Sequence, residues 1–285
     1  MKKFRITIFL AVLFPLAVSA QVADKQGAVV FPRAVFTKEE VDYSKRDPKY
    51  FTINPASVNL ILLGTTDAPD TSYVQMKEQP RDLAGVLVSI DSIINIAEKI
   101  WKVVEANKPV VGIDSKYAVA YPQGITSASQ LNSWSRPKVS SYAFYAENLY
   151  GGVMINCKYK VAFSYNGRYK STGRYLTAVA IIPEVAEVAW GYKFFMTAAV
   201  PDSTITNVGT SSAPVAAMQL KLSWKMSSVL KEMDGTSVYY IQGDGNIAEI
   251  ASPWRERPTE YVEVKAVNLE DLKAVAPLLE PEKVF

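Results

Sequence analysis

The chain of 285 residues contains no histidine. This absence excludes Ser-His-Asp and Cys-His nucleophilic triads, histidine-containing zinc sites and a histidine switch near neutral pH. A single cysteine, Cys157, excludes an intrachain disulfide and thiolate metal clusters. Neither a P-loop nor a dinucleotide-binding glycine motif is present. We therefore expect a non-catalytic protein with no metal and no cofactor, and carboxylate chemistry is the main enzymatic alternative.

Residues 1–20 have the pattern of a bacterial signal peptide. Three basic residues precede an apolar run over 6–18, and Val18 and Ala20 occupy the −3 and −1 positions of a signal-peptidase site. The run is too short to span a bilayer easily. The pattern predicts export of the mature chain, 21–285, to the periplasm, the outer-membrane surface or the medium.

The chain has no excess of either charge once the predicted signal peptide is removed. The whole chain has 31 basic and 28 acidic residues, and three of the basic ones lie in the first five positions. The predicted mature chain therefore has no net charge. This balance argues against a nucleic-acid partner.

The patterns along the chain predict five parts with different composition. Thr37 and Glu40 have the spacing of a capping box, which predicts a short helix in the N-terminal extension. The five expected parts are a signal peptide (1–20), a mixed N-terminal extension and linker (21–82), an amphipathic helix (83–107), a β-sandwich domain (108–267) and a C-terminal helix and tail (268–285).

The stretch 83–107 has apolar residues at helical spacing, within about 140° of a helical wheel. Charged residues interrupt it too often for a spanning helix. Its polar face has a net negative charge, which does not suit an anionic membrane surface. We expect the helix to pack on the sandwich, with a partner interface and a membrane surface as the alternatives. The residues expected at its interface are Ile90, Ile93, Ile94, Ile100 and Trp101.

From residue 109 to about 250, stretches of alternating apolar and polar residues are separated by turn residues. One such stretch places on the same face Met218, Leu220, Leu222, Trp224 and Met226. This pattern favours a mainly β fold, an antiparallel β-sandwich of about seven or eight strands with short flanking helices. Asn166-Gly167 predicts a type I′ hairpin turn inside a long two-stranded ribbon. Cys157 is in phase with apolar neighbours, so we expect it to pack in the core.

The order of elements over 83–122 resembles that of actinoporin-type pore-forming proteins. A long amphipathic helix runs into "KPVVGIDSKYAVAY", and an aromatic-rich β-sandwich follows. The resemblance is one of arrangement and implies a membrane-active protein. The chain departs from that pattern because the segment 21–82 precedes the helix, and no functional residue is carried over.

Basic residues mark the outward face of the predicted ribbon. Lys158, Lys160, Lys170 and Arg174 lie on that face, with Arg168 at the turn. They predict a patch for an anionic glycan or a lipid phosphate. The alternative is a solvated hairpin face whose lysines prevent edge-to-edge pairing.

Tryptophans in loops are candidates for stacking on sugars. Trp134 and Trp254 lie in stretches with loop composition, whereas Trp190 and Trp224 fall in alternating patterns and are expected in strand cores.

Together these patterns predict an exported, non-catalytic binding or structural protein of the bacterial periplasm, envelope or cell surface. The expected partners are an envelope glycan, a lipid phosphate or another protein, with no nucleic acid and no transmembrane helix after signal removal. The alternatives are a membrane-active pore-forming protein and a carbohydrate-active enzyme that uses carboxylates.

Overall fold

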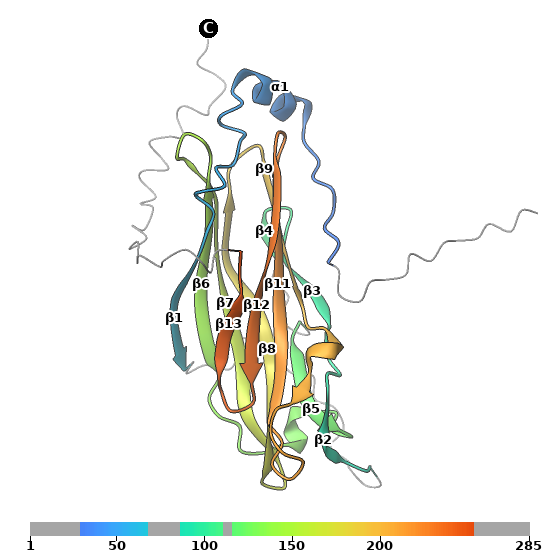
Figure 1. Cartoon of the computed structure of the whole chain (residues 1–285). Coiled ribbons are helices and arrows are strands. Elements are labelled where there is room, and N and C mark those ends of the chain that lie inside the picture. The colour runs from blue at the N-terminus through green and yellow to red at the C-terminus, as the bar shows by residue number, and fades with distance from the viewer. Residues whose placement is uncertain (1–28, 68–85, 111–115, 254–285) are drawn as a thin grey trace, which may run out of the picture.

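The computed structural model describes residues 29–67, 86–110 and 116–253 (Figure 1). Within these ranges the chain forms thirteen strands and one α-helix. The strands make two antiparallel sheets, which confirms the prediction of a mainly β, antiparallel protein. The described residues include no helix long and apolar enough to cross a membrane.

The first sheet contains the two longest strands. β7 and β8 each have 17 residues and pair along their length. At about 3.3 Å per residue, each runs roughly 55 Å, from one end of the molecule to the other (Figure 1). The order across this sheet is β1 (Asn59–Asp67), β6 (Lys138–Glu147), β7 (Val153–Tyr169), β8 (Thr172–Val188), β5 (Ala118–Gln123) and β2 (Ser89–Ile94).

The second sheet is built around the β11–β12 hairpin. Its order is β13 (Ile247–Ala251), β12 (Glu232–Gln242), β11 (Ala216–Ser228), β9 (Tyr192–Ala199), β3 (Ile100–Glu105) and β4 (Lys108–Pro109), and β10 (Thr206–Asn207) pairs with β11. Two short 3-10 helices, η2 (Ala128–Gln130) and η3 (Asp202–Thr204), lie in the connections.

Buried side chains from both sheets form one core. The predicted inward face of β11 is confirmed, because Met218, Leu220, Leu222, Trp224 and Met226 are all at most 1% exposed. Cys157 is also fully buried, as expected. The buried hydroxyls of Tyr159 in β7 and Tyr239 in β12 lie 2.7 Å apart and join the two sheets by a hydrogen bond, so neither polar group is left unsatisfied.

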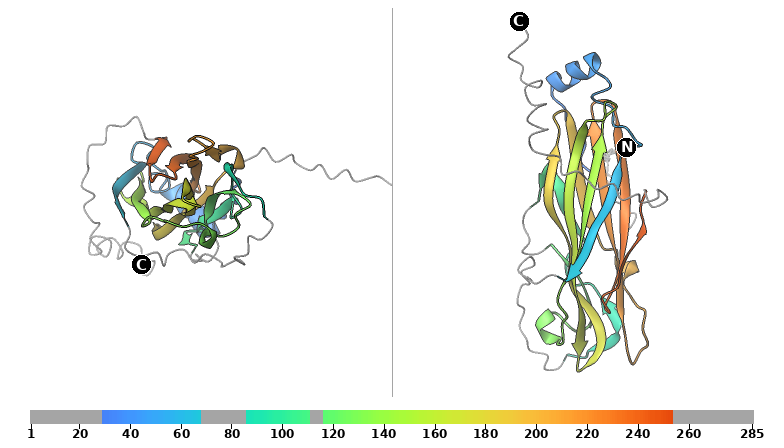
Figure 2. Two further views of the ribbon diagram at one scale, coloured as in Figure 1. Left: turned by 90° about the horizontal axis from the view of Figure 1, so that it is seen from below. Right: turned by 90° about the vertical axis from the view of Figure 1, so that its left-hand side faces the viewer.

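The helix α1 (Lys38–Arg46) lies across one end of the sheets (Figures 1 and 2). Its N-terminus has the predicted capping box. The Glu40 amide donates to the Thr37 hydroxyl, and the Thr37 amide donates to the Glu40 carboxylate at 2.6 Å. The helix ends at Arg46, because Asp47 and Pro48 follow.

The predicted amphipathic helix over 83–107 is wrong. The described part of this stretch forms β2 and β3, which belong to different sheets. The chain turns between them at Asn95, whose side chain accepts from the Ala97 amide and donates to the Glu98 carbonyl. The region is rich in Ile and Val, which favour strands. A bulge between Lys102 and Val104 shifts the alternation of β3, so its sequence mimics helical spacing.

The five residues expected at one helix interface consequently do not share a face. Ile90, Ile93 and Ile94 are half-buried on β2. On β3, Trp101 is buried, whereas its neighbour Ile100 is 52% exposed. Burial on alternate residues is what a strand requires.

The long ribbon is confirmed, but its turn is not at Asn166-Gly167. The turn residues are Lys170 and Ser171, with φ of 47° and 68°, between the paired residues Tyr169 and Thr172. Asn166 has a φ of 64° and lies at an irregularity inside β7. The dipeptide therefore distorts a strand instead of ending it.

Several predicted parts lie outside the described residues. They are the signal peptide over 1–20, most of the linker ending at 82, the C-terminal helix over 268–285 and Trp254.

Candidate functional site

The predicted basic patch is divided by the structure. Lys158 and Lys160 lie in the middle of β7, and Lys160 pairs with Glu184 on β8 at 2.5 Å. Lys170 lies ten residues further along the ribbon, about 30 Å away. Lys158 and Lys160 therefore do not share a surface with the other predicted cations.

A second set of cations gathers where the ribbon turns. We name the basic end by its five members: Arg136, Lys138, Arg168, Lys170 and Arg174. Three of these were predicted, and the structure adds Lys138, the first residue of β6, and Arg136 just before it.

Backbone contacts hold the segments of the basic end together. Asn132 and Arg168 exchange two hydrogen bonds of 2.8 and 2.9 Å. The Asn166 amide donates to the Gly243 carbonyl at 2.8 Å, and Lys138 Nζ donates to the Gly245 carbonyl at 2.6 Å. Segments distant in sequence are thus fixed side by side.

The basic end has a strong excess of positive charge. Segments 132–138, 165–175 and 243–246 contain five basic residues and one acidic residue, Asp244. None of the five cations forms an ion pair with another described residue. The buried Arg168 Nε also has no hydrogen-bond acceptor among the described residues. Cations clustered without counter-charges attract anions.

Trp134 also lies at the basic end, but its ring is not an open platform. A Cβ placed on Gly167 would lie 2.3 Å from the Trp134 ring, so the indole packs directly on the glycine backbone. Its Nε1 donates to the Ala128 carbonyl at 3.1 Å. Trp134 therefore fixes the shape of this end. Of the rings nearby, Tyr165 and Tyr169 are each covered by a lysine.

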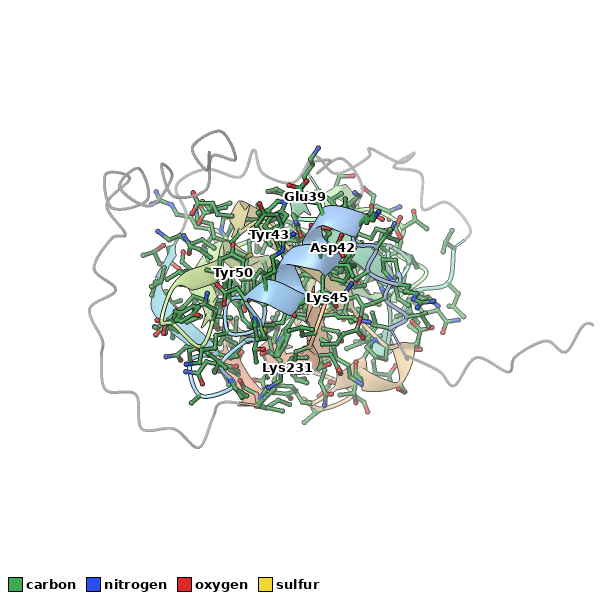
Figure 3. All side chains as sticks on the ribbon, turned by 90° about the horizontal axis from the view of Figure 1, so that it is seen from above. Glu39, Asp42, Tyr43, Lys45, Tyr50 and Lys231 are labelled. Carbon is green, nitrogen blue, oxygen red and sulfur yellow. The ribbon has the colours of Figure 1, made fainter. Side chains whose placement is uncertain are left out.

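The opposite end carries a surface that the sequence did not reveal. We name it the aromatic end: Tyr43 on α1, Tyr150 in the β6–β7 loop and Trp190 in the β8–β9 turn are 40%, 63% and 43% exposed. Leu149 and Leu230 are exposed as well. Figure 3 views this end along the sheets, with α1 lying across it.

The expectation that Trp190 packs in a strand core is wrong. β8 ends at Val188, and Gly191 has a φ of 81° in the turn that follows. A Cβ on Gly191 would lie 2.4 Å from the Phe51 ring. The close packing of this turn presents the Trp190 side chain at the surface. The sequence signals for exposed rings here were the glycines that follow Trp190 and Tyr150, because glycine is typical of turns.

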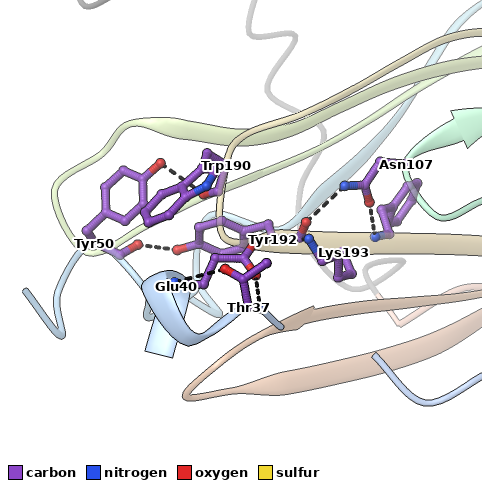
Figure 4. A network of polar contacts seen from close by, with 8 residues as sticks. Thr37, Glu40, Tyr50, Asn107, Trp190, Tyr192 and Lys193 are labelled. Carbon is purple, nitrogen blue, oxygen red and sulfur yellow. Dashed lines mark hydrogen bonds and ion pairs between the residues drawn. The ribbon is translucent and has the colours of Figure 1, made fainter. Parts of the chain in front are cut away.

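A polar network anchors α1 beneath the aromatic end (Figure 4). Glu40 is 3% exposed and pairs with Lys193 of β9 at 3.0 Å. Burial opposes ionisation of this carboxyl, but the Thr37 amide and the Lys193 ammonium outweigh it, so the pKa of Glu40 lies below its usual value of 4.5. Nearby, the Tyr192 hydroxyl donates to the Tyr50 carbonyl.

The exposed rings contact residues in and around this network. The Trp190 ring meets Tyr43 edge-on at 5.5 Å and Phe51 at 5.7 Å, and the Trp190 carbonyl accepts from the Tyr50 hydroxyl at 3.1 Å. The Tyr150 hydroxyl donates to Asp47 at 3.0 Å.

In the part of the chain that the structure describes, no three His, Cys, Asp or Glu side chains are grouped to hold a metal ion. Comparison with protein-family models, curated proteins and solved structures finds no match for this chain. The basic end and the aromatic end are the candidate sites, because each gathers exposed side chains of one chemical kind from separate segments.

Proposed function

We propose that this is an exported, non-catalytic binding protein of the bacterial envelope, attached to anionic material through its basic end. The observation that carries the proposal is the gathering of five cations from separate segments, none with a described ion-pair partner. As scaffold we propose a β-sandwich, which the shared core of the two sheets supports.

The positions of the cations favour a ligand instead of a purely structural role. Lysines that only guard a sheet edge would lie along an edge strand. Lys170 instead lies in the hairpin turn, Arg174 follows it near the start of β8, and both are exposed. The matching ligand carries phosphate or carboxylate groups, as acidic envelope glycans and lipid headgroups both do.

The pore-forming alternative would deploy either a helix over 83–107 or the long ribbon, and 89–94 and 100–105 form strands in different sheets instead of that helix. The carbohydrate-active enzyme that uses carboxylates rests on no observation of the described residues. Neither alternative is proposed further.

The test is co-sedimentation of the purified protein with phosphatidylglycerol vesicles, with phosphatidylcholine vesicles as the neutral comparison. Competition by heparin, a soluble acidic glycan, distinguishes a glycan from a lipid source of the anionic groups. We expect the double variant Lys170→Glu/Arg174→Glu to lose at least tenfold in affinity for the anionic probe that binds. Rising salt should weaken binding of the anionic probe more steeply for the wild type than for the variant, because fewer cations contribute to binding in the variant.

Lys158→Glu is the matched control, since it reverses one charge in the middle of β7, far from the basic end. It should retain most of the binding. Equal loss in both proteins would mean that only net charge matters, and binding to neither anionic probe would refute the proposal.

A further inference from the structure

We propose that the aromatic end is a second binding site, independent of the basic end, and that its ligand is a neutral oligosaccharide. Its three rings come from distant parts of the chain, at positions 43, 150 and 190. They lie at one end because Trp190 contacts Tyr43 on α1 and the Tyr150 hydroxyl donates to Asp47, directly after α1. Large exposed apolar groups gathered on one surface mark interaction sites more often than isolated ones do.

The rings are exposed and yet held in place. The Asn148 side chain accepts from the Tyr150 amide at 2.9 Å and from the Gly152 amide at 3.0 Å, which fixes the loop. The Tyr150 hydroxyl is tied to Asp47, and the Trp190 ring is wedged between Tyr43 and Phe51. Rings fixed before binding lose little conformational freedom when a ligand arrives. This arrangement suits recognition better than mere solvation.

The charge at this end favours a neutral ligand. Residues 38–50 contain four basic and four acidic side chains, and the loops that carry Tyr150 and Trp190 have none. The β11–β12 turn that carries Leu230 adds a single cation, Lys231. The basic end, by contrast, has five cations against one carboxylate. An anionic ligand therefore has no reason to prefer the aromatic end.

The groups beside the rings match the chemistry of a sugar. A pyranose has an apolar C–H face and a rim of hydroxyls that both donate and accept hydrogen bonds. Tyr43, Tyr150 and Trp190 are each at least 40% exposed, although Arg46 covers one face of the Tyr43 ring and Lys49 one face of the Tyr150 ring, at 5.5 and 5.9 Å from the ring centres. Beside the rings, Asp47 supplies an acceptor and Lys49 a donor. Both described hydrogen bonds to the Asp47 carboxylate go to Oδ1, which leaves Oδ2 without a described donor. Aromatic side chains with polar neighbours suit ligands that are apolar on one side and polar on the other.

The experiment is a binding screen of the purified protein on an array of neutral and acidic glycans. The neutral glycan with the strongest signal is then titrated while tryptophan emission is followed. We expect Trp190→Ala and Tyr150→Ala each to weaken binding about tenfold, the loss of one stacked ring. Tyr150→Phe keeps the ring and should remain within about threefold of the wild type.

Two further measurements keep the test decisive. Lys170→Glu at the basic end should leave affinity for the neutral glycan unchanged, so this proposal and the proposed function can fail separately. A thermal melt checks each fold, and Tyr150→Ala alone decides if Trp190→Ala does not fold, because Tyr150 is 63% exposed.

Binding of a neutral glycan that both alanine variants lose supports the proposal. Binding confined to acidic glycans overturns it, as does neutral binding that survives both alanine variants. If no neutral glycan binds and Trp190→Ala instead abolishes association with an envelope protein, the aromatic end is a protein interface and the sugar assignment is wrong.

Discussion

Replacement of Glu40 by Gln tests how firmly α1 is anchored to the sheets. The glutamine carbonyl can still accept from the Thr37 amide, but the ion pair with Lys193 is lost. Removing one partner of a buried ion pair costs about 3–5 kcal/mol, and the partial exposure of Lys193, at 25%, lowers that value. Loss of a carboxylate from the first helical turn adds about 0.5 kcal/mol. We expect the free energy of unfolding to fall by about 2–3 kcal/mol in total.

The assay is urea unfolding followed by tryptophan emission, at neutral pH and near pH 3. With a urea dependence of about 3 kcal/mol per molar, the midpoint of Glu40→Gln should lie roughly 0.8 M below that of the wild type. The folded-state pKa of Glu40 is depressed, so its contribution is complete above the unfolded value near 4.5 and disappears as the pH falls through the lower folded value. The difference between the two proteins should therefore narrow in acid.

The matched control is Glu39→Gln. Glu39 is exposed and also lies in the first turn of α1, but it has no ion pair with a described residue. Glu39→Gln should lower the free energy of unfolding by less than about 0.5 kcal/mol. Equal midpoints for the two variants, or a Glu40→Gln difference that stays constant into acid, would refute the anchoring argument.

Three further predictions concern the core and the ribbon. Burial raises the pKa of the Cys157 thiol to about 12, so a thiol reagent should modify Cys157 only in unfolded protein. If the folded protein reacted as fast as an exposed thiol does, the burial of Cys157 would be contradicted. Gly167→Ala should push the Trp134 ring off the basic end, with a loss of about 1–3 kcal/mol in thermal stability and a change in tryptophan emission; an unchanged spectrum would contradict that contact. Ser171→Gly should stabilise the protein by about 0.5–1 kcal/mol in a urea titration, because a φ of 68° strains a side chain but not a glycine; a lower midpoint would contradict the turn geometry.

Local patterns in the sequence were sufficient where a single segment determined the outcome. The Thr37–Glu40 spacing gave the capped helix, and alternation along β11 gave its buried face. The same approach failed over 83–107, because two short strands with a turn and a bulge imitate helical spacing. Periodicity cannot distinguish these cases when neighbouring short elements join different sheets.

The binding surfaces were less accessible to sequence reasoning. Lys170, Arg174 and Arg168 were found because they lie within one hairpin. The partnership of Arg136 and Lys138 with them depends on contacts between β6, β7 and the β12–β13 turn. The aromatic end depends on one helix and two separate turns, and the exposure of Trp190 follows from where β8 ends. Such juxtapositions are set by tertiary structure.

The length of the paired strands β7 and β8 also has a mechanical consequence. Their hydrogen bonds lie across the long direction of the molecule, and β7 is bonded to β6 on its other side as well. A pull applied between the hairpin tip and the opposite end would move β7 and β8 together, so the hydrogen bonds to their outer neighbours β6 and β5 would have to shear together instead of opening one after another. If the protein were held at its two ends, at α1 and at the hairpin tip, it would resist a stretching force.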